Sequence, residues 1–257
     1  MTSEKWTPGE LTNTIRRADI QLEVKGMKTL RDSFRDYVAV ETLEGESKYY
    51  AEGLGLQDAR KGIIFWSFPP VLRLQLMRSE YDAQIDTMVK VYAAYVLCWY
   101  DSNPAREIND RFEFPFEIDL DEFVDETVDR SKPWKYELHS VFVHSGDLYN
   151  GHNYVLIKPD QCASWLKFDD NRVTPVTDQG VLENSYGGEL LDGIAPQIQG
   201  NHDRANKMST NAYALAYIRK AAIDEVMPPL TEEDIPLHLS KMASGLWLKI
   251  PCSLFFF

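Results

Sequence analysis

Cysteine is scarce in this sequence, which contains three in 257 residues. Cys98, Cys162 and Cys252 show neither the paired spacing of a zinc site nor that of a disulfide framework. This argues against a disulfide-stapled secreted domain and indicates a reducing compartment. We also expect no signal peptide at the polar N-terminus, and the apolar run at residues 91–100 is too short to cross a bilayer.

Positive charge is also in short supply, with 27 Lys and Arg against 40 Asp and Glu and a formal net charge of -13. That balance argues against nucleic acid and anionic membrane as partners, and it suits a basic protein surface. Apolar residues are plentiful, because hydrophobic content is 44% and aromatic content 12%. The chain can therefore bury the core of one large domain or two small ones.

The interpretation of the whole sequence starts from the stretch between Tyr136 and Asp170. Three extended runs of aromatic and β-branched residues lie between turn formers, which predicts strands. The runs are Leu138 with Val141 and Val143, then Tyr154 to Ile157, then Trp165 to Phe168.

A hairpin formed by the second and third of these runs predicts a specific contact. If its centre lies between Asp160 and Gln161, His152 is opposite Asp169, Tyr154 opposite Lys167, and Leu156 opposite Trp165. Directly opposed side chains have Cβ atoms about 5 Å apart, so an imidazole and a carboxylate can hydrogen-bond. The carboxylate would then orient the imidazole, as in a nucleophile–His–Asp triad. The spacing alone also fits a surface His beside a surface Asp.

Elsewhere the sequence pattern predicts a mixture of strands and helices. Asp19 to Val24 alternates as a half-buried strand, Thr29 to Val40 has helical spacing, and Gly62 to Met77 reads as two strands joined at Pro69-Pro70. Residues 44–55 read as a polar loop, Leu56 to Lys61 as a short helix or turn, and Asn171 to Val181 as a strand and turn. Ala212 to Arg219 reads as a strand with Tyr213, Leu215 and Tyr217 on one face, and Leu230 to Met242 as the start of a helix.

Four motifs in order resemble the histidine box and C-terminal core of the ubiquitin-specific proteases. They are H-S-G-D-x-x-x-G-H from His144, W-x-K-F-D-D from Trp165, N-S-Y-G-G from Asn184, and N-A-Y-A-L-A-Y-I-R from Asn211. The similarity runs from about Asp19 to Ile235. The resemblance implies an α+β, papain-like cysteine protease fold, represented by its palm and part of its fingers and lacking the Cys-box thumb.

The same resemblance implies a cysteine-type deubiquitinase that cleaves the bond after the C-terminal Gly-Gly of ubiquitin. It makes His152 the base and Asp169 the orienting acid, with Asp170 as an adjacent alternative. The residues expected to flank the channel for the ubiquitin tail are His144, Ser145, Gly151, Asn153 and Tyr213. Asn153 departs from the family, which usually has an aromatic residue there, and Tyr213 is equally compatible with a core aromatic.

The nucleophile is the missing part of this expectation. In the family it lies in an upstream G-L-x-N-x-G-x-T-C-Y box, which also carries the Asn that stabilises the oxyanion, and this sequence contains no such box. None of the three cysteines has the exposed, electropositive setting of a reactive thiol. We therefore expect the isolated chain to be inactive. The alternatives are a catalytically dead ubiquitin-binding module and an unrelated scaffold.

The resemblance also sets the expected organisation and setting. Residues 1–18 are expected to be loosely ordered, 19–235 to be a partial catalytic domain, and 236–257 to be a tail of doubtful origin. An insert at about residues 88–107 is expected to be poorly integrated, either an added element or translated non-coding sequence. The expected partners are ubiquitin and ubiquitinated proteins, with no metal or cofactor, in the nucleus and cytoplasm.

Overall fold

A computed structural model describes residues 2–7, 11–15, 19–78, 80–82, 87–89, 109–131, 133–146, 151–160, 164–188 and 210–228. The three cysteines, the expected insert at about 88–107 apart from residues 88 and 89, and the chain after residue 228 lie outside this part, so the predictions made for them stay predictions. In the described residues no helix is long and apolar enough to cross a membrane.

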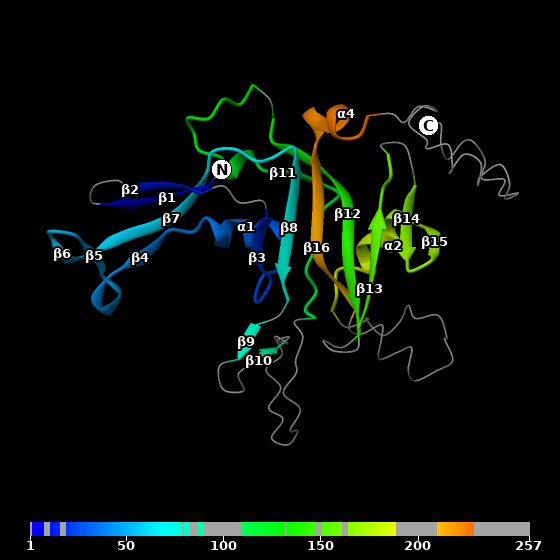
Figure 1. The fold of residues 1–257 in the computed structure, drawn as a ribbon, viewed down its shortest axis with the longest axis horizontal. Helices are drawn as coiled ribbons and strands as arrows, with labels where there is room; N and C mark the ends of the chain where they lie inside the picture. The colour runs from blue at the N-terminus through cyan, green and yellow to red at the C-terminus, as the bar shows by residue number, and fades with distance from the viewer. Residues whose placement is uncertain are drawn as a thin grey trace, which may run out of the picture.

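The main sheet contains eight strands, of which seven follow the order β15-β14-β13-β12-β16-β8-β3 while β11 pairs with β12 (Figure 1). Their bounds are β3 Asp19–Glu23, β8 Val71–Met77, β11 Glu117–Asp119, β12 Lys135–Ser145, β13 His152–Ile157, β14 Trp165–Asp169, β15 Arg172–Val176 and β16 Thr210–Arg219. The pairings are antiparallel except for β3 with β8. The outer strands of this path are β15 and β3.

Alternation of apolar and polar residues gives the sheet one buried face. In β8, Leu72, Leu74 and Leu76 are buried while the residues between them are exposed, and β3 repeats the pattern. Because side chains alternate between the faces of a strand, this period fixes which face meets the core. The strands predicted for Asp19 to Val24 and for the second half of Gly62 to Met77 are confirmed.

Helix α1 (Leu30–Tyr37) packs against the buried face, in agreement with the predicted helix. It begins at a capping box, in which the Thr29 hydroxyl accepts from the Asp32 amide and the Asp32 carboxylate accepts from the Thr29 amide. Phe34 on this helix is fully buried, with ring centroids 5.2 Å from Phe123 and 6.4 Å from Phe65. This aromatic cluster anchors the helix in the core.

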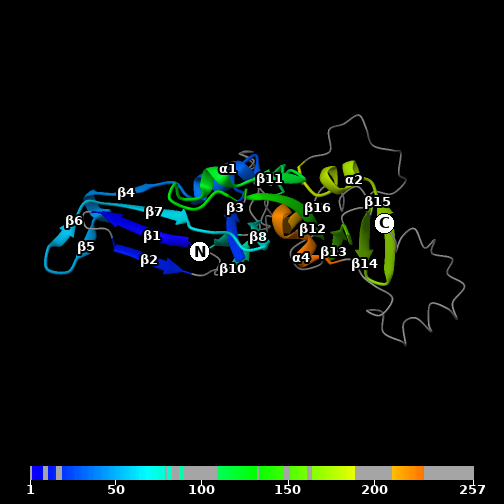
Figure 2. The ribbon, with the colours of Figure 1, turned by 90° about the horizontal axis from the view of Figure 1, so that it is seen from above.

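A second sheet forms an arm that extends away from the main one (Figures 1 and 2). It has the order β2-β1-β7-β4, and a β5–β6 hairpin lies near its tip. The bounds are β1 Thr2–Thr7, β2 Leu11–Ile15, β4 Glu41–Leu43, β5 Tyr49–Ala51, β6 Gly55–Gln57 and β7 Ala59–Phe65, with a 3-10 turn η1 at Gly45–Ser47.

The arm corrects three predictions. Residues 2–7 and 11–15 are strands rather than loosely ordered chain, because β1 pairs with both β2 and β7. The predicted loop at 44–55 contains strand β5, and the predicted helix or turn at Leu56 to Lys61 is part of β6 and β7. Strands β1 and β7 depend on pairing with strands remote in the sequence, which their own short sequences indicate only weakly.

The remaining elements are short: β9 Glu80–Asp82, β10 Thr87–Val89, η2 Asp121–Phe123, α2 Asp178–Glu183, η3 Lys220–Ala222 and α4 Ile223–Val226. Helix α2 corrects the prediction for Asn171 to Val181, whose second half is helical rather than a turn. Its N-cap is Thr177, whose side chain accepts from the Gly180 amide, and Val181 is its buried residue.

Arg78 is the unusual residue of the core, with only 4% of its surface exposed. Its guanidinium donates to three backbone carbonyls: Nε to Ala212 at 2.9 Å, Nη1 to Asp110 at 2.9 Å and Nη2 to Tyr186 at 3.3 Å. The side chain therefore joins the end of β8 to β16 and to two loop segments.

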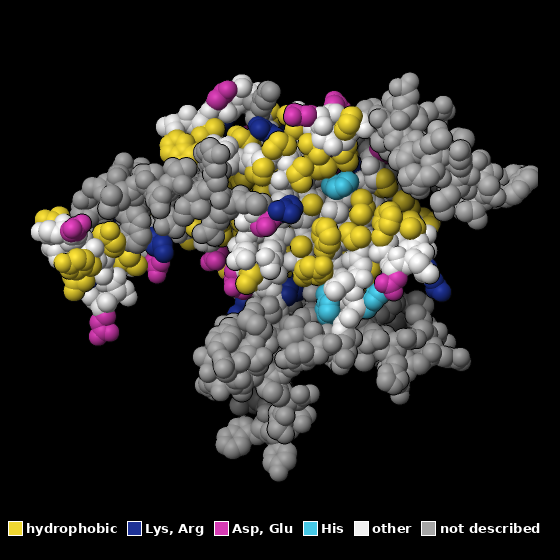
Figure 3. All heavy atoms as spheres, viewed as in Figure 1, with side chains coloured by type: hydrophobic (Ala, Val, Ile, Leu, Met, Phe, Trp, Pro, Cys, Tyr) yellow, Lys and Arg dark blue, Asp and Glu magenta, His cyan; other side chains and the backbone are white. Residues whose placement is uncertain are grey.

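The second face of the main sheet carries an apolar row. Phe142, Val155, Phe168 and Val173 are consecutive register partners across β12, β13, β14 and β15. Phe142, Phe168 and Val173 are all exposed, and Figure 3 shows hydrophobic side chains gathered over these strands. A sheet face that met only water would be more polar than this.

Candidate active site

The hairpin of β13 and β14 brings together the two residues singled out in the sequence. The observed register pairs Val155 with Phe168, Leu156 with Lys167 and Ile157 with Leu166. The predicted register, with Leu156 opposite Trp165, is therefore wrong by two residues. A shift of two keeps every side chain on its own face, so His152 lies diagonal to Asp169 instead of directly opposite.

The predicted contact between His152 and Asp169 is confirmed despite that shift. The His152 Nε2 atom lies 2.5 Å from Asp169 Oδ1. Because an ionised carboxylate only accepts, Nε2 must carry the proton and Nδ1 must carry the lone pair in the neutral ring. The imidazole is half-exposed, so Nδ1 can serve as a base toward a group outside this sheet.

Lys167 holds the other oxygen of the same carboxylate. Its Nζ atom lies 2.6 Å from Asp169 Oδ2 and 3.9 Å from the centroid of the Tyr154 ring. The Lys167 ammonium, and after it the His152 ring, hold the pKa of the Asp169 carboxyl below its usual value. Burial, and then the Asp169 charge, raise the pKa of Tyr154 to about 12. The site therefore contains an ionised carboxylate shared by two donors.

Asp170 lies in the two-residue turn between β14 and β15, with a φ of 51°. This left-handed conformation is one that Asp tolerates better than most residues. His152 donates its hydrogen bond to Asp169, so of the two acids Asp169 is the one placed to orient the imidazole. His152, Asp169 and Asp170 offer ligand atoms within 4.8 Å of one another, but the Lys167 ammonium already occupies the position where a cation would balance Asp169.

The predicted channel residues lie around this pair on β12, β13 and β16. His144 Nδ1 donates to Asn153 Oδ1 at 2.9 Å, and the two are register partners. Ser145 is the register partner of His152, and its hydroxyl lies 2.7 Å from that of Thr210. Gly151 is exposed immediately before β13. The structure therefore gathers the predicted residues of these strands at one end of the main sheet.

Tyr213 corrects one detail of the prediction for β16. Phe142 pairs with Ala214 and Val143 with Ala212, so Tyr213 is the extra residue of a β-bulge. Its ring lies 6.3 Å from that of Phe142, so it does not share the buried face of Leu215 and Tyr217 as predicted. The bulge places this aromatic on the open face of the sheet.

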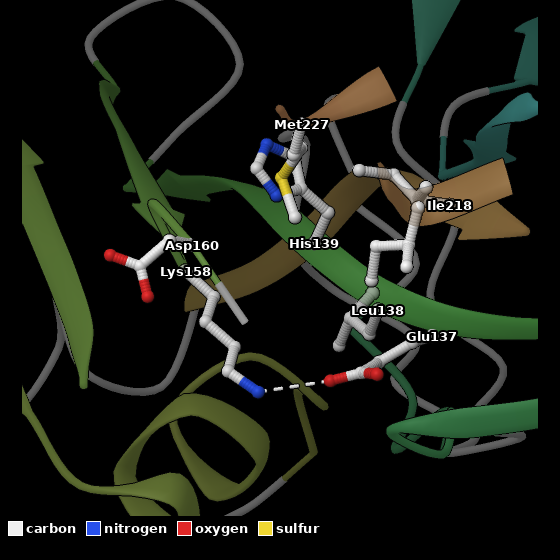
Figure 4. Close-up of a pocket in the computed structure, with 8 residues that line it drawn as sticks. Glu137, Leu138, His139, Lys158, Asp160, Ile218 and Met227 are labelled. Carbon is white, nitrogen blue, oxygen red and sulfur yellow. Dashed lines mark hydrogen bonds and ion pairs between the residues drawn. The ribbon is translucent and has the colours of Figure 1, made fainter. Parts of the chain in front are cut away.

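A small pocket lies at the opposite end of β12 and β13, away from His152 (Figure 4). The imidazole of His139, the extra residue of a second bulge, lines it beside Met227, while Lys158 bonds Glu137 across it at 2.9 Å. Burial lowers the pKa of His139. Its Nδ1 is buried and has no hydrogen-bond partner among the described residues. A buried imidazole with an unpaired Nδ1 suits a histidine packed in the fold.

Sequence reasoning did not assign a role to Lys167. The residue stands in the W-x-K-F-D-D motif, and the predicted hairpin placed it opposite Tyr154. The usable signal was that Lys167 and Asp169, two residues apart on one strand, must share a face.

An imidazole held by a carboxylate at the end of a largely antiparallel sheet is the arrangement expected of the predicted papain-like fold. Residues 7–217 match the family model described as ubiquitin carboxyl-terminal hydrolase. The chain belongs to this family, as predicted, and the match begins earlier than the expected boundary at residue 19.

The curated relatives are themselves named as hydrolases of this family. The chain is 52% identical over 221 residues to ubiquitin carboxyl-terminal hydrolase 15 of Schizosaccharomyces pombe, covering 86% of this chain and 18% of the relative. It is 46% identical over 226 residues to ubiquitin C-terminal hydrolase 12 of Arabidopsis thaliana, covering 86% and 19%. It is 42% identical to ubiquitin carboxyl-terminal hydrolase 7 of Drosophila melanogaster, covering 86% and 17%. The chain thus spans less than a fifth of these relatives.

A solved structure supports the fold. A chain of the SAGA Ubp8/Sgf11/Sus1/Sgf73 DUB module bound to ubiquitin aldehyde superposes with a TM-score of 0.59 at 21% identity. The match covers 84% of this chain and 40% of that one. The predicted papain-like α+β fold is confirmed.

Proposed function

We propose that this chain supplies the base and the orienting acid of a thiol-dependent hydrolase that cleaves the bond after the C-terminus of ubiquitin. The observation that carries the proposal is the 2.5 Å contact between His152 Nε2 and Asp169 Oδ1 in a member of this family. The names of the relatives, and the ubiquitin aldehyde bound to the similar DUB module, support ubiquitin as the partner.

In this proposal each atom of the pair has a step. His152 Nδ1 accepts the proton of a cysteine thiol, and the thiolate attacks the carbonyl carbon of the ubiquitin C-terminus. Asp169 stabilises the imidazolium that results, and His152 then returns the proton to the leaving amine. A water molecule, activated by the same imidazole, releases ubiquitin from the acyl-enzyme. The cysteine comes from a Cys box of the kind that the family carries.

Hydrolysis of ubiquitin 7-amido-4-methylcoumarin tests the proposal. The 257-residue chain is expected to show no activity alone. It is expected to turn over when fused behind the Cys-box segment of the Schizosaccharomyces pombe relative. In the fused enzyme, His152→Gln should lower kcat/KM by about a thousandfold or more.

The matched control is His139→Gln, the same substitution at the other end of the sheet, which should leave kcat/KM near its starting value at neutral pH. Equal losses in the two variants would contradict the assignment. Cleavage by the unfused chain would show that the nucleophile has been misplaced.

The presence of Asn153 favours a second candidate function, that of a ubiquitin-binding module without activity. An amide held by His144 stands at the position where the family usually has an aromatic ring. Tight binding of ubiquitin by the fused chain without cleavage would favour this candidate. Recovery of turnover by Asn153→Tyr would then identify this position as the cause.

A further inference from the structure

We propose that Lys167 is a positioning residue for the His152–Asp169 pair, holding one oxygen of the carboxylate so that the other faces the imidazole. The inference rests on the proposed function, which needs that imidazole to be oriented.

Four side chains form a continuous series on one face of β13 and β14. The Tyr154 ring lies 3.9 Å from Lys167 Nζ, which lies 2.6 Å from Asp169 Oδ2. Asp169 Oδ1 in turn lies 2.5 Å from His152 Nε2. The order ring, ammonium, carboxylate, imidazole places opposite partial charges next to each other at every step.

A carboxylate without a second partner has no fixed plane. The terminal torsion of Asp has a broad, roughly two-fold profile, so either oxygen can turn toward the imidazole at little cost. An ammonium bound to Oδ2 restricts that rotation and leaves Oδ1 aimed at His152. Lys167 could not do this as a freely moving side chain, because lysine has a flexible stem. The aromatic face of Tyr154 restrains it through a cation–π contact.

The ion pair between Lys167 and Asp169 also influences the charge of the carboxyl group. Lys167 favours the ionised form of Asp169. The ionised carboxylate is a stronger acceptor for Nε2–H than a protonated carboxyl group would be. The other polar and charged groups of the surrounding strands and turn include His144 and Ser145 on β12, Asn153 on β13, Asp170 in the turn, and Arg172 and Thr174 on β15. Among these groups, Lys167 is the one bonded to the second oxygen in the described structure.

NMR of the whole 257-residue chain tests the inference without any need for activity. In Lys167→Met, the side-chain carboxyl ¹³C signal of Asp169 should titrate at higher pH than in the parent. The ring ¹⁵N signals of His152 should lose the pattern of a pure Nε2–H tautomer. Lys167→Arg should preserve both signals.

The matched control is Lys158→Met, which removes an ion pair with Glu137 at the far end of the same hairpin. It should leave the Asp169 and His152 signals in place. A folded Lys167→Met variant whose two signals superimpose on those of the parent would overturn the inference.

Kinetics of the fused enzyme separate this inference from the proposed function. Lys167→Met should lower kcat about tenfold with KM unchanged, because the substrate does not contact a positioning residue. A rise in KM alone would overturn the inference by making Lys167 a substrate-binding residue. Inactivity of the fused parent, with the NMR changes still present, would refute the proposed function and leave the positioning intact.

Discussion

Replacing the buried Arg78 by methionine tests the junction that supports the active-site end of the sheet. Methionine fills much of the same space but removes the donor from the carbonyls of Ala212 and Asp110, while the Tyr186 carbonyl keeps the Phe112 amide. An unsatisfied buried carbonyl costs about 1–3 kcal/mol. Relief of the buried charge and penetration of water offset part of the sum. We therefore expect a net loss of about 3 kcal/mol, within the range for breaking a buried charged contact.

The assay is thermal and urea unfolding followed by near-ultraviolet circular dichroism. For a chain of this size, a loss of about 3 kcal/mol lowers Tm by about 6–12 °C. Arg73→Met is the matched control, because Arg73 is on the same strand but pairs with Asp19 at the surface, with 62% and 51% of the two side chains exposed. Such pairs contribute less than about 1 kcal/mol. If the two variants unfolded at the same temperature, the reasoning about the buried guanidinium would be refuted.

Two further predictions concern stability. Burial lowers the pKa of His139 in the folded chain from the usual histidine value of 6.5. As the pH falls from 7.5 to 5.5, the unfolded chain therefore binds more protons than the folded chain. The free energy of unfolding should fall over this range, by at most about 1.4 kcal/mol per pH unit. His139→Gln should flatten this pH dependence of the unfolding free energy in urea titrations. The lowered pKa of Asp169 contributes only at more acidic pH. An unchanged slope in the variant would exclude His139 as the source. Phe34→Ala should lower the free energy of unfolding by about 3–5 kcal/mol, because it leaves a cavity at the centre of the aromatic cluster. Phe142→Ala on the open face of the sheet should lower it far less in the same assay. Equal losses would mean that Phe34 does not contribute more to core packing than an exposed ring.

The contact between His152 and Asp169 was predictable because it depends on parity, while the register depends on turn geometry. Any even shift of β13 against β14 leaves the two side chains on one face, and both are long enough to meet across a diagonal. The connection between two hairpin strands fixes their register, and the sequence between β13 and β14 did not reveal the two-residue difference.

Other features were not predictable because their partners are remote in the sequence. Arg78 reads as an ordinary surface arginine after an alternating strand, yet its acceptors lie 32 to 134 residues away. The two bulges on β12 and β16 insert single residues, so the strict period of two misplaced Tyr213. Strand β1 is stabilised by pairing with β7 as well as with β2, a contribution that a local pattern cannot contain.

The two outer strands of the main sheet restrict which molecules can associate with it. In β15, Pro175 has no amide hydrogen, so the edge next to the His152–Asp169 pair lacks one donor that an added strand would need. In β3, exposed Asp19 and Glu23 place charge on the opposite edge. Both devices oppose edge-to-edge aggregation between copies of the chain. They also mean that an extended peptide approaching His152 must lie across strand ends, because the outer edge of β15 is a poor template for β-augmentation.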